Sequence, residues 1–345
     1  MHTIGQYVYR FHRKGVFVSP SSNGQENKVH EVAGYGIASV FTPAWNRRKG
    51  YASHMMSLLH WVLAPRTSEF NLGDFPQAWG QPPPEVKLAG DGYFSVLYSD
   101  VGAEFYNNSG PVGNKGGGWE VKEAISTVWQ VPPLTETTVD VEGAWSWLKD
   151  SDLEQVWKEE VDFLKADLAK SAVSQTTVSF LTDEGVAAFQ STRALFGRED
   201  EVSMDIWGVR MDTLESPGDS KAPTATYATW SVDARPLPAT LIVTRLRASD
   251  QTFPALLQKI QEAARKSGIT RVETWNLPGD LQKIAAKWDG KTFERNEHLP
   301  AIRWYGKGAT QDIVWAFNEK SVFDIATILL HIDQRTDILT FLDFE

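Results

Sequence analysis

The beginning of the chain shows two runs of apolar and polar positions that favour extended strands. Gln6–Lys14 and Val29–Phe41 are rich in β-branched and aromatic residues, and Ser19–Gly24 between them is a strong turn signal. This pattern predicts an antiparallel hairpin with a loose loop. In Tyr51–Leu63 the apolar residues recur at helical spacing instead, which predicts a helix shortly after the hairpin.

The pattern then predicts a strand, a helix and another strand. Tyr93–Tyr98 is a short apolar run typical of a strand, and Val101–Asn107 predicts a short helix with Asp100 as its N-cap. Gly110–Gly118 is rich in glycine and predicts a flexible loop. Trp119–Ser126 predicts the strand that follows this loop.

The second part of the chain predicts a similar series of elements. These are a helix over Asp152–Leu168, a strand over Thr177–Leu181, a helix over Asp183–Phe196, strands over Val202–Met211, Thr224–Val232 and Ala239–Arg247, a helix over Phe253–Lys266, a strand over Ile269–Trp275, a helix over Asp280–Trp288 and a strand over Ala301–Tyr305. From the three neighbouring strands onward, the order repeats that of the first part, which indicates an internal repeat. The alternative is that this order is simply common in α/β folds.

The length of the chain, 345 residues, predicts about two domains. Val131–Thr138 contains two prolines and several polar residues, and it is the best candidate for a boundary. We therefore expect one domain over residues 1–130 and another over residues 131–345. The last segment, Ser321–Glu345, suggests no function.

Charge and composition exclude several classes of function. The formal net charge of −10 argues against a nucleic-acid-binding protein with a broad basic face. The absence of cysteine excludes a disulfide scaffold, a thiolate metal site and a cysteine nucleophile. The seven histidines lack the spacing of a metal site, so we expect no metal cofactor. No secretory signal or membrane-spanning stretch is visible, which favours a cytoplasmic protein without a membrane partner.

One segment between a predicted strand and a predicted helix has the features of a phosphate-binding turn. It holds Arg47-x-x-Gly50-x-Ala52, with Arg48 and Lys49 inside it. Backbone N–H groups at the N-terminus of a helix point at an anion, and the helix dipole favours negative charge there. The small residues let a pyrophosphate approach the backbone, and the basic side chains add local positive charge. The alternative is a basic loop that only caps a core helix.

Known phosphate motifs narrow this interpretation. No Gly-Lys-Ser/Thr sequence follows the turn, as a nucleotide P-loop requires, and the Gly-x-Gly opening of a dinucleotide fingerprint is missing. Instead, Val40-Phe41-Thr42-Pro43 running into the turn resembles the acetyl-CoA motif of the GCN5-related N-acetyltransferases, and Ser95–Tyr106 resembles the next strand and helix of that fold. With the second part included, the chain is most similar to the fungal lysine N6-acetyltransferases of lysine catabolism.

The resemblance implies an α/β (α+β) fold: a mixed, mostly antiparallel central sheet flanked by helices, with a second, degenerate domain of the same kind. It also implies acetyl-CoA as cosubstrate, with the pantetheine arm along the strand and the pyrophosphate on the turn. The residues in these two places are Val40, Phe41, Thr42, Arg47, Arg48, Lys49, Gly50, Tyr51, Ala52 and Ser53. The equivalent turn of the second domain, Leu246–Phe253, has no glycine. We expect it not to bind CoA and expect its domain to close the acceptor side of the cleft.

The catalytic and acceptor-binding residues follow from the same resemblance. Tyr106 corresponds to the tyrosine that protonates the departing thiolate, and the alternative is a core aromatic. Trp230, Asp233 and Arg235 lie in a segment similar to the family's second domain. There Arg235 would hold the carboxylate and Asp233 the α-amine of a free lysine, unless the two form only a surface ion pair. No residue stands out as the general base.

We therefore expect an acetyl-CoA-dependent N-acetyltransferase that acts on a small-molecule amine, with the ε-amine of free L-lysine favoured. One alternative is another acceptor, such as a polyamine or a secondary-metabolite amine. Another is an inactive or CoA-binding interaction protein. Only 46 residues precede Arg47, which is room for a hairpin but not for the early helices of the acetyltransferase fold. We expect those N-terminal elements to be missing.

Overall fold

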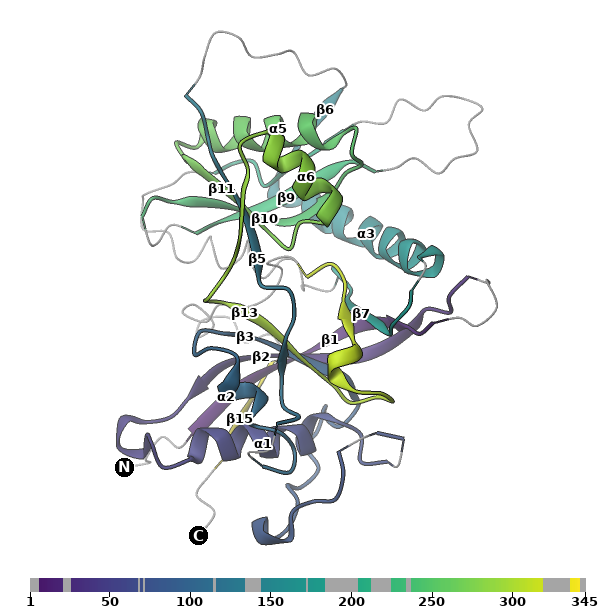
Figure 1. Cartoon of the computed structure of the whole chain (residues 1–345), viewed down its shortest axis with the longest axis vertical. Helices are drawn as coiled ribbons and strands as arrows, with labels where there is room; N and C mark the ends of the chain where they lie inside the picture. The colour runs from purple at the N-terminus through teal and green to yellow at the C-terminus, as the bar shows by residue number, and fades with distance from the viewer. Residues whose placement is uncertain are drawn as a thin grey trace.

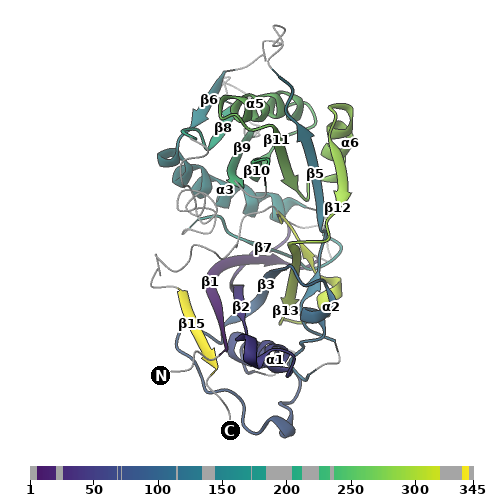
Figure 2. The same cartoon turned by 90° about the vertical axis from the view of Figure 1, so that its left-hand side faces the viewer.

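The computed structural model has two β-sheets with their helices, stacked along the long axis of the molecule (Figures 1 and 2). The structure describes residues 6–20, 26–67, 69–70, 72–113, 116–133, 144–171, 173–183, 204–211, 225–233, 237–318 and 336–341. Within these residues, none of the helices is long and apolar enough to cross a membrane.

The first sheet, in the lower half of Figure 1, has the strand order β14-β7-β1-β2-β3-β13-β4, and β15 also pairs with β1. Its strands are β1 (Gln6–Val18), β2 (His30–Phe41), β3 (Gly92–Ser99), β4 (Glu120–Val121), β7 (Thr177–Phe180), β13 (Leu299–Trp304), β14 (Val314–Trp315) and β15 (Thr336–Phe341). β1 and β2 form the predicted antiparallel hairpin, whereas β2 and β3 are parallel. The helix α1 (Tyr51–Leu63) connects the parallel pair, as the sequence predicts, and lies against one face of the sheet.

The second sheet has the order β12-β5-β11-β10-β9-β8-β6. Its strands are β5 (Ile125–Gln130), β6 (Trp145–Leu148), β8 (Gly208–Met211), β9 (Tyr227–Asp233), β10 (Thr240–Arg247), β11 (Arg271–Trp275) and β12 (Lys291–Glu294). β10 and β11 are its parallel pair, connected by α5 (Phe253–Lys266). The other helices of the chain are α2 (Glu104–Asn107), α3 (Asp150–Lys170) and α6 (Gly279–Lys287).

The two halves repeat one sequence of elements. The series β1, β2, α1, β3, α2, β4, β5 corresponds step by step to β9, β10, α5, β11, α6, β12, β13. In both series the second and third strands are parallel and are joined by a helix, and the remaining pairs are antiparallel. This confirms the predicted mixed, mostly antiparallel sheets and the second unit of the same kind.

The last strand of each repeat lies in the sheet of the other repeat. β5 follows β4 in the chain but lies between β11 and β12 of the second sheet. β13 follows β12 but lies between β3 and β4 of the first sheet. Figures 1 and 2 show β5 rising from the first half into the second. The repeats therefore exchange one strand reciprocally.

This exchange bears on the expected boundary near residue 130. β7, β13, β14 and β15 all come from the segment 131–345, yet they lie in the first sheet. A single cut at residue 130 therefore does not separate the two sheets, because the chain passes between them several times. The division into two domains stays a prediction.

Each sheet has its own buried core. Met56, Leu59, Trp119 and Tyr305 are buried between α1 and the first sheet. In α5 the buried residues recur at intervals of three and four, so one helical face packs on the second sheet. These apolar faces explain why the predicted ends of α1 and α5 are confirmed residue for residue.

Other predicted elements differ from the structure for local reasons. The helix predicted over Val101–Asn107 begins only at Glu104, because Gly102 has a φ of 84°, outside the helical range. Asp100 does not cap it; its carboxylate accepts a hydrogen bond from the His298 N–H at 3.0 Å. The predicted strand over Trp119–Ser126 is divided between β4 and β5. The helix predicted over Asp183–Phe196 lies almost entirely outside the described residues.

Candidate active site

The turn that follows β2 has the backbone conformation of an open anion site. Arg48 and Gly50 both adopt positive φ angles, 62° and 84°, and α1 begins at Tyr51. A Cβ atom at Gly50 would meet nothing within 4 Å. The left-handed conformation of the backbone therefore favours glycine here, although no protein atom crowds the position. The close approach of a pyrophosphate to Gly50 stays a prediction.

Several N–H groups of this turn are available to a ligand. The N–H groups of Arg48 to Ala52 donate no backbone hydrogen bond within the described residues. The first intrahelical bond runs from His54 N–H to Gly50 O at 3.0 Å. The first turn of α1 contains no acidic residue and no side-chain cap, so the positive end of its dipole is not compensated.

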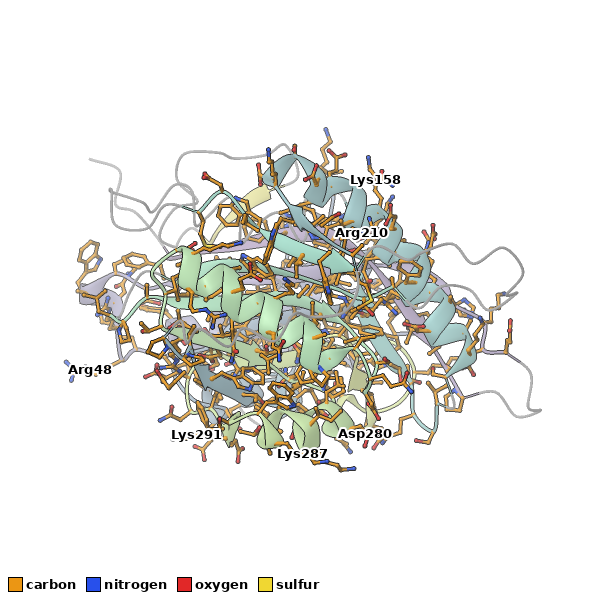
Figure 3. All side chains as sticks on the ribbon, turned by 90° about the horizontal axis from the view of Figure 1, so that it is seen from above. Arg48, Lys158, Arg210, Asp280, Lys287 and Lys291 are labelled. Atoms are coloured by element: carbon orange, nitrogen blue, oxygen red, sulfur yellow. The ribbon has the colours of Figure 1, made fainter. Side chains whose placement is uncertain are left out.

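The basic side chains of the turn are exposed. Arg47 folds back, and its Nε donates to the Thr42 carbonyl oxygen at 3.1 Å, which fixes the loop. Arg48 extends away from the molecule at its rim (Figure 3), and Lys49 is also exposed. The turn thus combines available backbone donors with exposed cations in a protein of net negative charge.

The strand that leads into the turn has an open edge. The pairing of β2 with β3 ends at Gly36 and Val96, although β2 continues to Phe41. A β-bulge at Ser39, with a φ of 50°, bends β2 at this point. The segment that contains Val40 and Phe41 therefore keeps β1 on one side, whereas no strand of the described residues pairs with its other side.

Two hydroxyl groups beside this open edge have no partner. Ser39 Oγ and Thr42 Oγ1 are both buried, and neither makes a hydrogen bond within the described part of the chain. Buried hydroxyls are usually satisfied, so these two indicate a polar ligand along the strand. The amides of a pantetheine arm would supply suitable partners.

Tyr106 lies on α2, which is tied to the first turn of α1. Ser53 Oγ and Ser109 Oγ are 3.1 Å apart, so the predicted cofactor residue Ser53 contacts the end of α2. The Tyr106 ring is half-buried, with its centroid 6.3 Å from that of Trp119. Burial, and then the negative charge of Asp100, raise the pKa of Tyr106 to about 12. The phenol is therefore a proton donor throughout the physiological range.

A buried network that the sequence did not predict lies beneath this helix. His60 Nε2 is 2.9 Å from the Ser109 carbonyl oxygen, and His60 Nδ1 is 3.1 Å from the Tyr305 hydroxyl. Ser95 Oγ accepts from the Trp119 indole at 3.0 Å and contacts the same hydroxyl. No sequence motif indicates that these residues meet, because they come from separate elements far apart in the chain.

The equivalent place in the second repeat is closed. Ser249 and Thr252 bond each other's backbone N–H groups with their hydroxyls, at 3.2 and 3.0 Å, so the turn is satisfied internally. Pro254, in the first turn of α5, has no N–H at all. The end of β10 is filled by Arg245 and Arg247, which bind Glu160 of α3. That the second unit does not bind CoA stays a prediction.

The residues predicted to bind the acceptor do not gather at the first turn. Trp230 is 1% exposed, and its indole N–H donates to the Ile206 carbonyl oxygen at 2.9 Å, so it is a core residue. Asp233 pairs with Thr240 at the end of the second sheet that points away from the first sheet (Figure 1). Arg235 lies outside the described residues. A role for these residues in acceptor binding stays a prediction.

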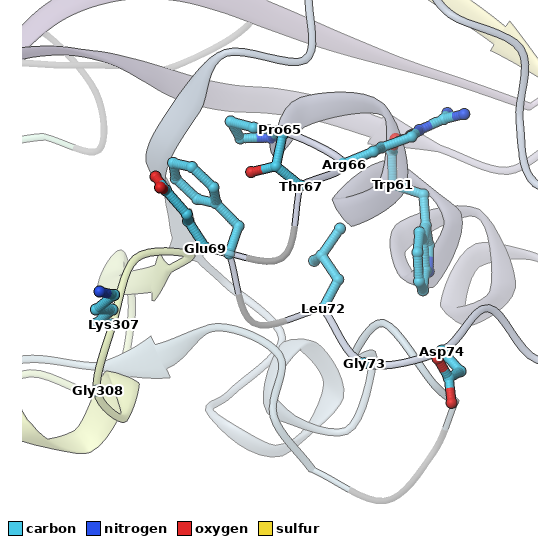
Figure 4. A pocket seen from close by; sticks show the side chains of 11 residues that line it. Trp61, Pro65, Arg66, Thr67, Glu69, Leu72, Gly73, Asp74, Lys307 and Gly308 are labelled. Atoms are coloured by element: carbon cyan, nitrogen blue, oxygen red, sulfur yellow. Dashed lines mark hydrogen bonds between the residues drawn. The ribbon is translucent and has the colours of Figure 1, made fainter.

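A cavity of about 640 Å³ lies at the other end of α1 (Figure 4). It is lined by Trp61, Pro65, Arg66, Thr67, Glu69, Phe70, Leu72, Gly73, Asp74, Lys307 and Gly308. The 13 residues of α1 put roughly 20 Å between this cavity and the turn. The cavity therefore does not belong to the cofactor site. Within the described residues, no cluster of acidic and histidine side chains would hold a metal ion.

The strand order of each half, with its open parallel pair and the helix behind it, defines the fold of the GCN5-related N-acetyltransferases. The sequence model of the family described as "LYC1 GNAT-like C-terminal domain" matches residues 128–323, which is more than half of the chain, so the chain belongs to this family. No curated protein matches the sequence.

Three solved structures are similar to the chain over most of its length. A GCN5-related N-acetyltransferase from Kribbella flavida is 12% identical, with a TM-score of 0.45, and the match covers 87% of this chain and 57% of that one. Another from Anabaena variabilis is 12% identical, with a TM-score of 0.42 and coverages of 84% and 58%. A probable N-acyltransferase from Enterococcus faecalis is 13% identical, with a TM-score of 0.44 and coverages of 87% and 59%. The chain thus spans less than two thirds of each of them.

Proposed function

We propose that the protein transfers the acetyl group of acetyl-CoA to the amine of a small molecule, with the ε-amine of free L-lysine as the acceptor. Membership of the acetyltransferase family supports the class of reaction. The observation that carries the proposal is the open turn at the start of α1, next to the open edge of β2. The second repeat has the same elements but a closed turn, so the openness belongs to one site only.

In this proposal the turn and the strand hold the cosubstrate. The N–H groups of Arg48 to Ala52 bind the pyrophosphate, and Arg47, Arg48 and Lys49 add charge around it. The amides of the pantetheine arm pair with the open edge of β2 near Val40. Ser39 and Thr42 then find partners for their buried hydroxyls. The thioester reaches the gap between β2 and β3.

The reaction requires a neutral amine. A lysine ε-amine has a pKa near 10.4, so only a small fraction is deprotonated at pH 7. The amine nitrogen attacks the thioester carbonyl carbon and forms the C–N bond, and the tetrahedral intermediate then releases the CoA sulfur as the C–S bond breaks. The ammonium proton leaves to water or to a base. Desolvation of the amine between the two halves would assist the first step.

Tyr106 is the group that would assist the leaving thiolate. Its pKa of about 12 makes it a weaker acid than a thiol, whose pKa is about 8.5. Tyr106 therefore stabilises the departing sulfur mainly by donating a hydrogen bond, without first giving up its proton. We expect the substitution Tyr106→Phe to lower kcat by about 10²-fold with little change in the KM for acetyl-CoA.

The experiment that tests this function has two arms. The first follows thiol release from acetyl-CoA with L-lysine between pH 7 and 9, alongside a panel of polyamines and other amines. The second measures acetyl-CoA binding by calorimetry for the wild type and for Gly50→Val. Gly268→Val is the matched control, because Gly268 also has a positive φ, 69°, and open space around it, but lies in the second repeat.

We expect lysine-dependent thiol release that rises with pH, because more of the amine is then neutral. Both glycine variants should lose similar stability, but only Gly50→Val should weaken acetyl-CoA binding, by tenfold or more (~1.4 kcal/mol). If the protein acetylates another amine but not lysine, that amine becomes the proposed acceptor. Absence of acetyl-CoA binding by the wild type would refute the function altogether.

A further inference from the structure

Arg295 lies where the two exchanged strands pass between the sheets. It follows the last residue of β12 and precedes β13, and its backbone N–H donates to the carbonyl oxygen of Ala124, next to the start of β5, at 2.6 Å. Both sheets and both connections therefore meet at this residue. In Figure 2 this crossing lies between the two halves of the molecule.

The guanidinium of Arg295 is buried but incompletely paired. The residue is only 9% exposed, and its Cζ atom lies 3.6 Å from the centroid of the Trp275 ring. Nη1 donates to the His298 carbonyl oxygen at 3.3 Å, whereas Nε and Nη2 have no partner within the described part of the chain. A buried cation with unsatisfied donors is costly unless an anion joins it.

No carboxylate of the described residues forms an ion pair with Arg295. Glu273 acts on it only through its field, and its own oxygens are already engaged. They accept from Ser126 Oγ at 2.7 Å, from Trp275 Nε1 at 2.8 Å and from Arg271 Nη2 at 3.0 Å. Burial lowers the pKa of Arg295 to about 10, so the guanidinium still carries its charge at neutral pH.

Arg295 is connected through the Trp275 ring to the end of β3, the strand that borders the gap. Tyr98, on β3 beyond the last pair with β2, has its ring centroid 5.9 Å from that of Trp275. The Asp100 carboxylate, one residue after β3, lies 2.8 Å from His298 Nδ1. The charge of Asp100 also acts on Tyr106, the residue proposed to assist the leaving thiolate. Asp100 thus lies near Tyr106 and, through His298, near Arg295.

We propose that Arg295 binds a carboxylate of the amine acceptor, which makes the acceptor an amino acid and not a simple diamine; this inference rests on the proposed acetyl transfer. Stacking on Trp275 fixes the plane of the guanidinium, and the unpartnered Nε and Nη2 form one of the edges that grip a carboxylate with two parallel bonds. Because these atoms are covered in the structure, the proposal requires the side chains around them to move apart when the acceptor binds.

The test compares two acceptors that differ only in the carboxylate. L-lysine and 1,5-diaminopentane present the same terminal amine, and KM and kcat are measured for both with the wild type, Arg295→Gln and Arg295→Lys. Arg271→Gln is the matched control, because it removes a neighbouring arginine that already has a carboxylate partner. Circular dichroism and melting temperature establish that each variant is folded.

We expect Arg295→Gln to raise the KM for lysine at least tenfold and to leave that for the diamine within about twofold. Arg295→Lys keeps the charge but loses the bidentate geometry, so its KM for lysine should be intermediate. If Arg295→Gln does not fold, the KM values of Arg295→Lys for lysine and for the diamine decide whether Arg295 binds the carboxylate. Equal losses with both acceptors would mean that Arg295 has only a structural role.

The same experiment separates this inference from the proposed function. If the wild type has the same KM for the diamine as for lysine, it is an acetyltransferase that gains nothing from the carboxylate, so the role of Arg295 falls while the function stands. A wild type that acetylates no amine removes the function, and the role of Arg295 with it.

Discussion

The imidazole of His60 is enclosed on every side, and its two nitrogens serve as one donor and one acceptor. Its ring stacks on Trp119 at 4.1 Å between centroids, and it contacts Ser109 and Tyr305. Burial, and then the positive charge of Arg303, lower the pKa of His60 to about 3. The neutral ring thereby holds α1 against the end of α2, and so holds Tyr106 in place.

The low pKa of His60 predicts that the protein loses stability in acid. The unfolded chain binds a proton at this residue below about pH 6.5, whereas the folded chain does so only below about pH 3. The contribution of His60 is complete above pH 6.5, and it is lost as the pH falls between these values, by about 1.4 kcal/mol per pH unit. Urea unfolding of the wild type and His60→Gln between pH 7 and 4 measures this slope. His30→Gln is the control. If the free energy of unfolding falls with pH equally steeply in the wild type and in His60→Gln, the prediction is contradicted.

Single residues were predictable where the chemistry is local. The turn from Arg47 to Ala52 could be singled out by its charge, its glycine and its position between a strand and a helix, and its role in cofactor binding stays a prediction. Ser39 gives no such signal, because its role depends on a bulge that β1 imposes. Nothing in the sequence distinguishes Arg295 from the other arginines either. Only the fold, which buries it against Trp275, does so.

Among the elements, α3 differs from any helix of the first repeat because it binds the end of β10 through buried ion pairs. Glu160 is fully buried on the inner face of α3, where Arg245, Arg247 and Tyr227 all donate to it. Burial alone would raise the pKa of Glu160, but the two arginines outweigh it, and the net pKa lies below the ordinary value. The ion pairs thus tie the end of β10 to α3.

Replacement of Glu160 should loosen this half of the molecule. Glu160→Gln removes the buried negative charge that both Arg245 and Arg247 bind, although Arg247 keeps its second carboxylate partner, Asp167, and this loss costs roughly 3–5 kcal/mol. The wild-type contribution is present above the unfolded pKa of about 4.3 and is lost as the pH falls through the folded value. Denaturant unfolding at pH 7 tests this, with Glu154→Gln on the exposed face of α3 as control. Similar midpoints for both variants would show that the cluster adds no stability.

The elements themselves follow from hydrophobic spacing wherever they bury a face. α1 and α5 have a continuous apolar stripe, so their ends could be predicted closely. β12 was not predicted, because all four of its residues are exposed and therefore show no pattern of buried positions. Its pairing with β5 alone identifies it as a strand. The helix predicted over Val101–Asn107 was too long because the pattern did not register the turn at Gly102.

In the whole molecule, the exchange of β5 and β13 makes each sheet depend on both repeats. Sequence order revealed the repeat, but it could not reveal the exchange. A strand with alternating apolar residues fits either sheet equally well, and only the tertiary partners decide. Ile302 of β13 illustrates this, because it is fully buried against Val96 of the other repeat.

This dependence predicts one cooperative unfolding transition. Ile302→Ala leaves a cavity in the first sheet and should cost about 2–5 kcal/mol. The midpoints followed by tryptophan fluorescence and by far-ultraviolet circular dichroism should fall together. Val314→Ala in β14, at an exposed sheet edge, should change little. Two separate transitions, with only one of them shifted, would show that the halves unfold independently.

The same exchange sets an order of events while the chain is being synthesised. β3 leaves the ribosome early, but Leu299, the partner of Ser99, is made 200 residues later. Until then β13, the strand that lies between β3 and β4, has not been made. Both strands therefore present unpaired edges to other nascent chains. Contacts so distant in sequence also close slowly. The interval between the two strands is therefore when this protein is most exposed to aggregation and has the greatest need of a chaperone.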